Sequence, residues 1–71
     1  MNKFMNLDAK LSNDMRSETD EGRKNIMNYI LNLATTYRLK ISKGNGMNEW
    51  NSFSSACTPL IQGTDLVKYL R

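Results

Sequence analysis

The chain has 71 residues, which is enough for one domain. A domain of this size buries only about 60% of the surface that its unfolded form exposes. Its one cysteine, Cys57, and the lack of histidine exclude an intramolecular disulfide and the common zinc sites as extra sources of stability. The net charge is +3, and the basic excess lies after residue 24, because residues 1–24 carry five basic and five acidic side chains.

Apolar residues that recur every three or four positions predict the first helix, over residues 3–16. Phe4, Leu7, Leu11 and Met15 fall on one side of such a helix.

A longer second helix is predicted over residues 19–42. Its first turn is acidic, and Ser17 or Thr19 can cap the unpaired backbone amides. The residues that follow place one wide apolar side toward a core, and Lys43-Gly44-Asn45-Gly46 is typical of a helix end. We expect this helix to be the most buried element, with Ile30, Leu33 and Tyr37 in the core.

The remaining apolar stripe, formed by Met47, Trp50, Ser54 and Cys57 with Phe53 alongside, predicts a third helix over residues 47–57. We expect Trp50 to be buried between this helix and the second one. Thr58-Pro59 should end the helix, because the residue before a proline avoids the helical region. A last short helix should begin at Thr64 or Asp65, with Leu66, Val67 and Leu70 facing inward and with Lys68, Tyr69 and Arg71 facing outward.

No segment alternates with a period of two long enough to predict a sheet. The fold class predicted is therefore all-α: a single domain over residues 1–71 that forms a small bundle of three main helices plus a short C-terminal helix.

The composition also bears on location. The N-terminus reaches Asp8 before any apolar run, which is not typical of a signal peptide, and Asn28 and Asn32 interrupt the most apolar stretch. Small secreted domains are usually rich in disulfides. We expect a cytoplasmic protein with no membrane segment.

Catalysis is not expected. Without histidine the chain lacks the commonest general base and metal ligand, and it has no glycine-rich phosphate loop. Cys57 has no base to activate its thiol, so its position on the Trp50 stripe indicates a small buried hydrophobe. We predict no catalytic residue, cofactor or metal ion.

The side of the second helix opposite its apolar face carries no charge. Asn25, Asn28, Asn32, Thr35, Thr36 and Leu39 lie there, whereas a solvated helix usually presents paired lysine and glutamate side chains. Neutral amides and hydroxyls cost less to desolvate than ions. The face is therefore a candidate contact with a protein partner or a second copy, through Asn28, Asn32, Thr35 and Leu39. The alternative is an indifferent surface that reflects an AT-rich gene.

A second candidate surface is basic. Arg38, Lys40 and Lys43 follow one another near the end of the second helix, and Lys68 and Arg71 could join them as phosphate contacts. Compensation of the helix dipole explains cations at a helix C-terminus equally well.

In its size and its nine asparagines the chain resembles small accessory proteins of bacteriophages and mobile elements, although no motif carries the resemblance. Such proteins commonly bind and inhibit a host protein. We therefore predict a non-catalytic interaction protein that regulates or inhibits a larger protein. The prediction includes a homodimer as one form of this protein. The alternative function is a small basic regulator that binds DNA or RNA.

Overall fold

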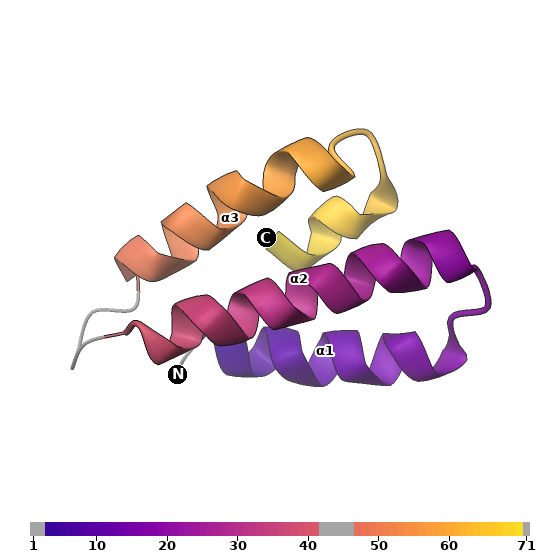
Figure 1. Ribbon diagram of the computed structural model, residues 1–71, viewed down its shortest axis with the longest axis horizontal. Helices are drawn as coiled ribbons and strands as arrows, with labels where there is room; N and C mark the ends of the chain where they lie inside the picture. Colours follow the sequence, from indigo (N-terminus) through magenta and orange to yellow (C-terminus); the bar gives the residue numbers. More distant parts are fainter. Residues whose placement is uncertain (1–2, 42–46, 71) are drawn as a thin grey trace.

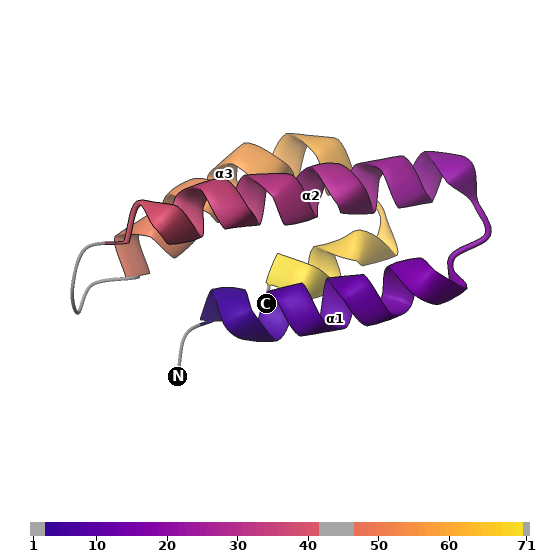
Figure 2. The same cartoon turned by 60° about the horizontal axis from the view of Figure 1, so that its bottom comes forward.

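The computed structural model describes residues 3–41 and 47–70. These residues form three α-helices and one short 3-10 helix, namely α1 (Lys3–Ser17), α2 (Glu21–Leu39), α3 (Met47–Ile61) and η1 (Asp65–Leu70). The helices α1 and α2 lie side by side in opposite directions, and α3 packs against α2 (Figure 1). The η1 helix packs against both α1 and α3 (Figure 2). The predicted all-α bundle is confirmed, and no strand occurs in the described ranges.

The core combines the apolar stripes of all four helices. Its buried members are Phe4, Leu7, Leu11, Met27, Ile30, Ala34, Trp50, Phe53, Cys57, Ile61, Leu66 and Tyr69. On each α-helix these residues are three or four positions apart, so each helix buries one side and leaves the other in water.

The aromatic rings meet at the end of the bundle where α1 begins. Phe53 lies within 5.3–6.3 Å, centroid to centroid, of the rings of Phe4, Trp50 and Tyr37. The Phe4 and Trp50 rings contact edge to face at 5.1 Å. The prediction that Trp50 is buried is confirmed, although its ring packs on α1 rather than only between α3 and α2.

The expectation that the second helix is the most buried element is wrong. Among the side chains that the structure describes, four of α3 are buried, against three of α2, since α3 supplies Phe53 and Ile61 to the centre. Ile30 is in the core as predicted, but Leu33 and Tyr37 are only partly buried at its edge. The side of α2 that is fully buried is instead the one that carries Met27 and Ala34.

The start of α2 is capped by Asp20, and not by Ser17 or Thr19. The Asp20 side chain accepts hydrogen bonds from the backbone amides of Gly22 (2.9 Å) and Arg23 (3.3 Å). Ser17 is still part of α1, where its hydroxyl donates to the Asp14 carbonyl. The cap therefore lies one residue before the helix.

The far end of α2 also differs from the prediction. The helix ends at Leu39 with Lys40 as its C-cap, about three residues earlier than expected. The predicted glycine-rich stop, Lys43-Gly44-Asn45-Gly46, lies outside the described residues.

Pro59 does not end α3, contrary to the prediction. The helix continues to Ile61, because this brings the Ile61 side chain into the core, where it is fully buried. A proline inside a helix removes one backbone hydrogen bond and crowds the carbonyl four residues earlier, and here the residue is exposed on the outer side of α3. Gly63, with φ at 85°, then turns the chain, as a glycine after a helix commonly does.

The last helix begins where expected, but Tyr69 was placed on the wrong side. Its side chain is 6% exposed, and its hydroxyl donates a hydrogen bond to the Asp14 carboxylate of α1. A 3-10 helix repeats every three residues, so Leu66 and Tyr69 share the inward side, with Val67 and Leu70 partly buried beside them.

Candidate interaction surface

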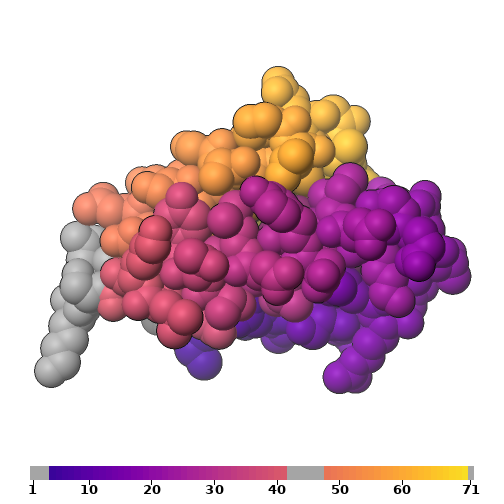
Figure 3. Space-filling view, in the orientation of Figure 1, coloured from indigo at the N-terminus to yellow at the C-terminus, as the bar shows by residue number. Residues whose placement is uncertain are grey.

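The outward side of α2 is uncharged for most of its length. Between Asn25 and Leu39 the exposed residues are Asn25, Asn28, Tyr29, Asn32, Thr36 and Leu39, and none of them is charged. Leu39 is 79% exposed and Tyr29 is 48% exposed. We call this set the neutral α2 face. The space-filling view shows one side of α2 that the other helices leave uncovered (Figure 3).

Three of the four contact residues predicted from the sequence belong to this exposed set. Asn28, Asn32 and Leu39 are exposed, whereas Thr35 is half-buried at its edge. The structure therefore places all four predicted residues along one helix surface, with Tyr29 added to them.

The polar groups of the neutral α2 face divide into two kinds. The Thr35 and Thr36 hydroxyls donate to the carbonyls of Leu31 (3.0 Å) and Asn32 (3.2 Å), four residues earlier in the same helix. Such hydroxyls keep a hydrogen bond when a partner covers them. The side-chain amides of Asn25, Asn28 and Asn32 make no hydrogen bond within the described part of the chain. These amides can therefore bond to another chain.

The outward side of α3 is also uncharged, which sequence reasoning did not notice. Glu49, half-buried, is the only charged residue of this 15-residue helix. In the sequence, only the amino-acid composition of this segment indicated that its outward side is uncharged. Among the described residues, the exposed charged side chains lie instead on α1, on η1 and at the two ends of α2.

The predicted phosphate contacts do not form one described cluster. Arg38 donates to the Asp8 carboxylate of α1, so its charge is compensated. The Lys40 and Lys68 ammonium groups lie over the rings of Tyr37 and Tyr69, at 5.2 and 5.4 Å. The other two predicted residues, Lys43 and Arg71, lie outside the described residues.

Arg23 joins three segments, a role that the sequence pattern did not suggest. Its guanidinium contacts Glu18, before α2, at 3.1 Å and makes two hydrogen bonds with Asp65 of η1, at 2.7 and 3.3 Å. These bonds lower the pKa of the Glu18 and Asp65 carboxyls and raise the pKa of Arg23. Arg23 thus holds η1 against the start of α2.

The Arg23 contacts predict a pH dependence of stability. The folded pKa values of Glu18 and Asp65 are depressed, so their stabilising effect is present above the unfolded values and is lost as the pH falls through the folded ones. The melting temperature should therefore fall between about pH 5 and about pH 3. In the Arg23→Gln variant the melting temperature should be lower at the start of this range and should fall less steeply as the pH decreases. Arg16→Gln, on exposed α1 surface, should behave as the parent; an equal slope in all three proteins would contradict this role.

No described feature suggests chemistry at Cys57. The side chain is fully buried, and burial raises the pKa of its thiol to about 11. A thiol in this state is a poor nucleophile near neutral pH. Within residues 3–41 and 47–70 there is no group of three or more acidic or cysteine side chains that could hold a metal ion. The same ranges contain no helix long and apolar enough to cross a membrane.

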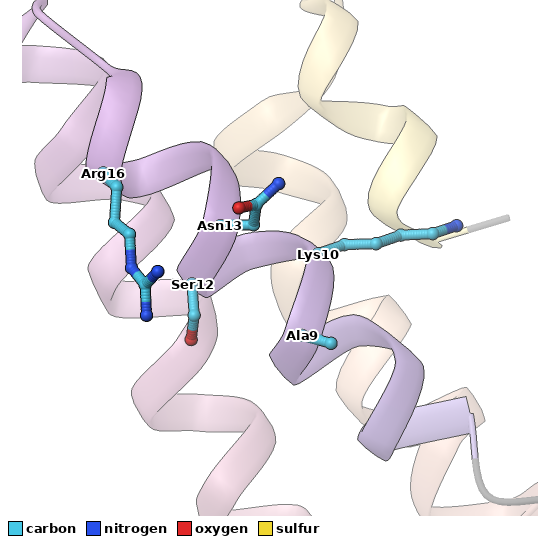
Figure 4. A pocket seen from close by; sticks show the side chains of 5 residues that line it. All are labelled: Ala9, Lys10, Ser12, Asn13 and Arg16. Carbon is cyan, nitrogen blue, oxygen red and sulfur yellow. The ribbon is translucent and has the colours of Figure 1, made fainter.

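A shallow depression on the outer side of α1 is lined by Ala9, Lys10, Ser12, Asn13 and Arg16. All five residues belong to one helix surface, and the Lys10 and Arg16 side chains point in different directions (Figure 4). The two cations therefore do not converge on a common ligand position.

Comparisons with known protein families, with curated protein sequences and with solved structures gave no match to this chain.

Proposed function

We propose that the protein is a non-catalytic interaction protein of the cytoplasm, which binds a larger protein partner through the neutral α2 face and so regulates or inhibits it. The observation that carries the proposal is the absence of charge among the exposed residues from Asn25 to Leu39. A charge buried without a partner costs several kcal/mol, so the centre of an interface needs a surface of this kind.

Two further features support the proposal. Leu39 and Tyr29 are exposed apolar side chains on the same helix, where they can fill pockets of a partner. The three unused asparagine amides supply donors and acceptors that fix the orientation of the contact.

Affinity capture from the native cell, followed by mass spectrometry, tests the proposal. The folded protein should recover one larger protein, and treatment with nuclease should leave that recovery unchanged. If recovery disappears with nuclease, the contact depends on nucleic acid and the proposal is wrong.

The alternative function, a small regulator that binds DNA or RNA, has one observation in its favour. Tertiary contacts engage Asp8, Glu18 and Asp65 in ion pairs, whereas among described basic residues only Arg23 and Arg38 are so engaged. The exposed basic side chains Lys10, Arg16, Lys24, Lys40 and Lys68 make no ion pair within the described residues, so they can contact phosphate groups.

This alternative makes a distinct prediction. At about 50 mM salt, duplex DNA or RNA should bind, and the logarithm of the affinity should fall linearly with the logarithm of salt concentration. Lys40→Glu should weaken binding to all sequences, while Asn51→Glu, on exposed α3 surface, provides a control for added negative charge. Fluorescence anisotropy measures both, and no binding at this salt concentration would remove the alternative.

A further inference from the structure

The spacing of residues along the neutral α2 face matches a seam between two helices. Six positions that alternate by four and three residues run along the outward side of α2. They are Asn25, Asn28, Asn32 and Leu39 of the neutral α2 face, the half-buried Thr35 at its edge, and the charged Glu21 in the first turn of the helix. This is the spacing with which helices pack side by side in coiled coils. The arrangement is symmetric about the midpoint between Asn28 and Asn32.

We propose that the occupant of this face is a second copy of the chain, with the two α2 helices antiparallel about a two-fold axis beside that midpoint. The inference goes beyond the proposed function: it uses the same face, so a second copy and a larger protein would compete for it. In a two-fold interface each contact occurs twice, so the symmetric spacing places Asn28 opposite Asn32 of the other copy at both sides of the axis. Asn25 then lies opposite Thr35.

Hydrogen bonding favours this pairing. The Asn28 and Asn32 amides, which make no bond within the described chain, can each donate to and accept from the other across the seam. The Thr35 hydroxyl keeps its bond to the Leu31 carbonyl when it is covered. The seam can therefore lose its water without leaving these groups unpaired.

Charge favours the antiparallel direction. Glu21 lies at the start of α2, and Lys40 caps its end, so antiparallel helices bring the carboxylate of one copy to the ammonium end of the other. Opposed helix dipoles act in the same sense. Lys10, Arg16 and Lys68 lie on α1 and η1 rather than on α2, whereas the exposed Lys24 of α2 flanks the seam next to Asn25.

The size of the seam sets the expected strength. From Glu21 to Leu39 it is about 27 Å long and one helix wide, so its area falls at the low end of specific interfaces. The dimer should therefore dissociate on dilution.

Sedimentation velocity on the purified protein, between about 5 and about 500 µM, tests the proposal. The parent should change from monomer to dimer over this range. Asn32→Lys should raise the dissociation constant about tenfold or more, because it places an unpaired cation at the centre of the seam. The double variant Asn28→Asp/Asn32→Lys should regain the dimer, since each aspartate then faces a lysine. Circular dichroism at low concentration checks that both variants fold as the parent does.

Three results would overturn the inference. These are a parent that stays monomeric throughout, a dimer that Asn32→Lys leaves unchanged, and a double variant that stays as dissociated as Asn32→Lys. The last result is expected of parallel helices, in which like charges meet. A monomeric parent that still captures a larger protein through Leu39 would overturn the inference and leave the proposed function standing. A dimer with the expected variants and no captured protein would do the reverse.

Discussion

Replacing Phe53 by alanine should destabilise the fold by about 3–5 kcal/mol, which is the usual cost of removing a buried phenylalanine. Phe53 is fully buried, and its ring contacts three other aromatic rings that come from α1, α2 and α3. A loss of this size is most of the stability of a domain this small, so the variant should be largely unfolded at room temperature.

Urea denaturation followed by circular dichroism measures the effect. Tyr29→Ala is the control, because it removes an aromatic ring that is 48% exposed on α2 and should change stability far less. Equal midpoints for the two variants would contradict the placement of Phe53 at the centre of the core.

The second large effect concerns the part of α3 beyond Pro59. Ile61→Ala should cost about 2–5 kcal/mol, because the side chain is fully buried against the core. The neighbouring Leu60 is 48% exposed, so Leu60→Ala should cost much less.

The same denaturation experiment compares these two variants directly. If α3 ended at Cys57, as predicted from Thr58-Pro59, the two positions would not be distinguished in this way. A larger loss for Leu60→Ala than for Ile61→Ala would show that the register of α3 is wrong.

Apolar spacing was enough to predict the three main helices and most of the core. Phe4, Leu7 and Leu11 are buried as their spacing indicated, and so are Ile30, Trp50 and Cys57. This works because a helix buries one side, whichever neighbour covers it.

The helix ends were less predictable, because several residues compete there. Ser17, Thr19 and Asp20 can all cap a helix, and only the geometry of the turn selects Asp20. At Pro59 the local preference against helix is outweighed by the burial of Ile61 two residues later.

Long-range polar contacts could not be predicted at all. Tyr69 is turned inward with its hydroxyl at Asp14, 55 residues away in the chain, and Arg23 reaches Asp65 at a separation of 42. Neither pair has a local pattern, since tertiary packing alone brings the partners together.

The candidate site was partly predictable because the exposure of a helix residue, unlike a long-range contact, follows from local helix geometry. A helical wheel places Asn28, Asn32 and Leu39 opposite the apolar side, and exposure follows from that position alone. The exposure of Tyr29 depends on how α1 and α3 pack around α2, whereas the single charged residue of α3 was already visible in the sequence.

The central claim, that the neutral α2 face contacts another chain, is tested most directly by one pair of substitutions. Leu39→Glu places a carboxylate at the most exposed large apolar side chain of that face, and Met5→Glu does the same at the 62% exposed Met5 of α1. Both proteins should fold. Quantitative mass spectrometry then compares the proteins that each variant captures and the extent to which each variant associates with itself. We predict that Leu39→Glu weakens association about tenfold or more, while Met5→Glu leaves it unchanged. Equal association by both variants and the parent would contradict the claim.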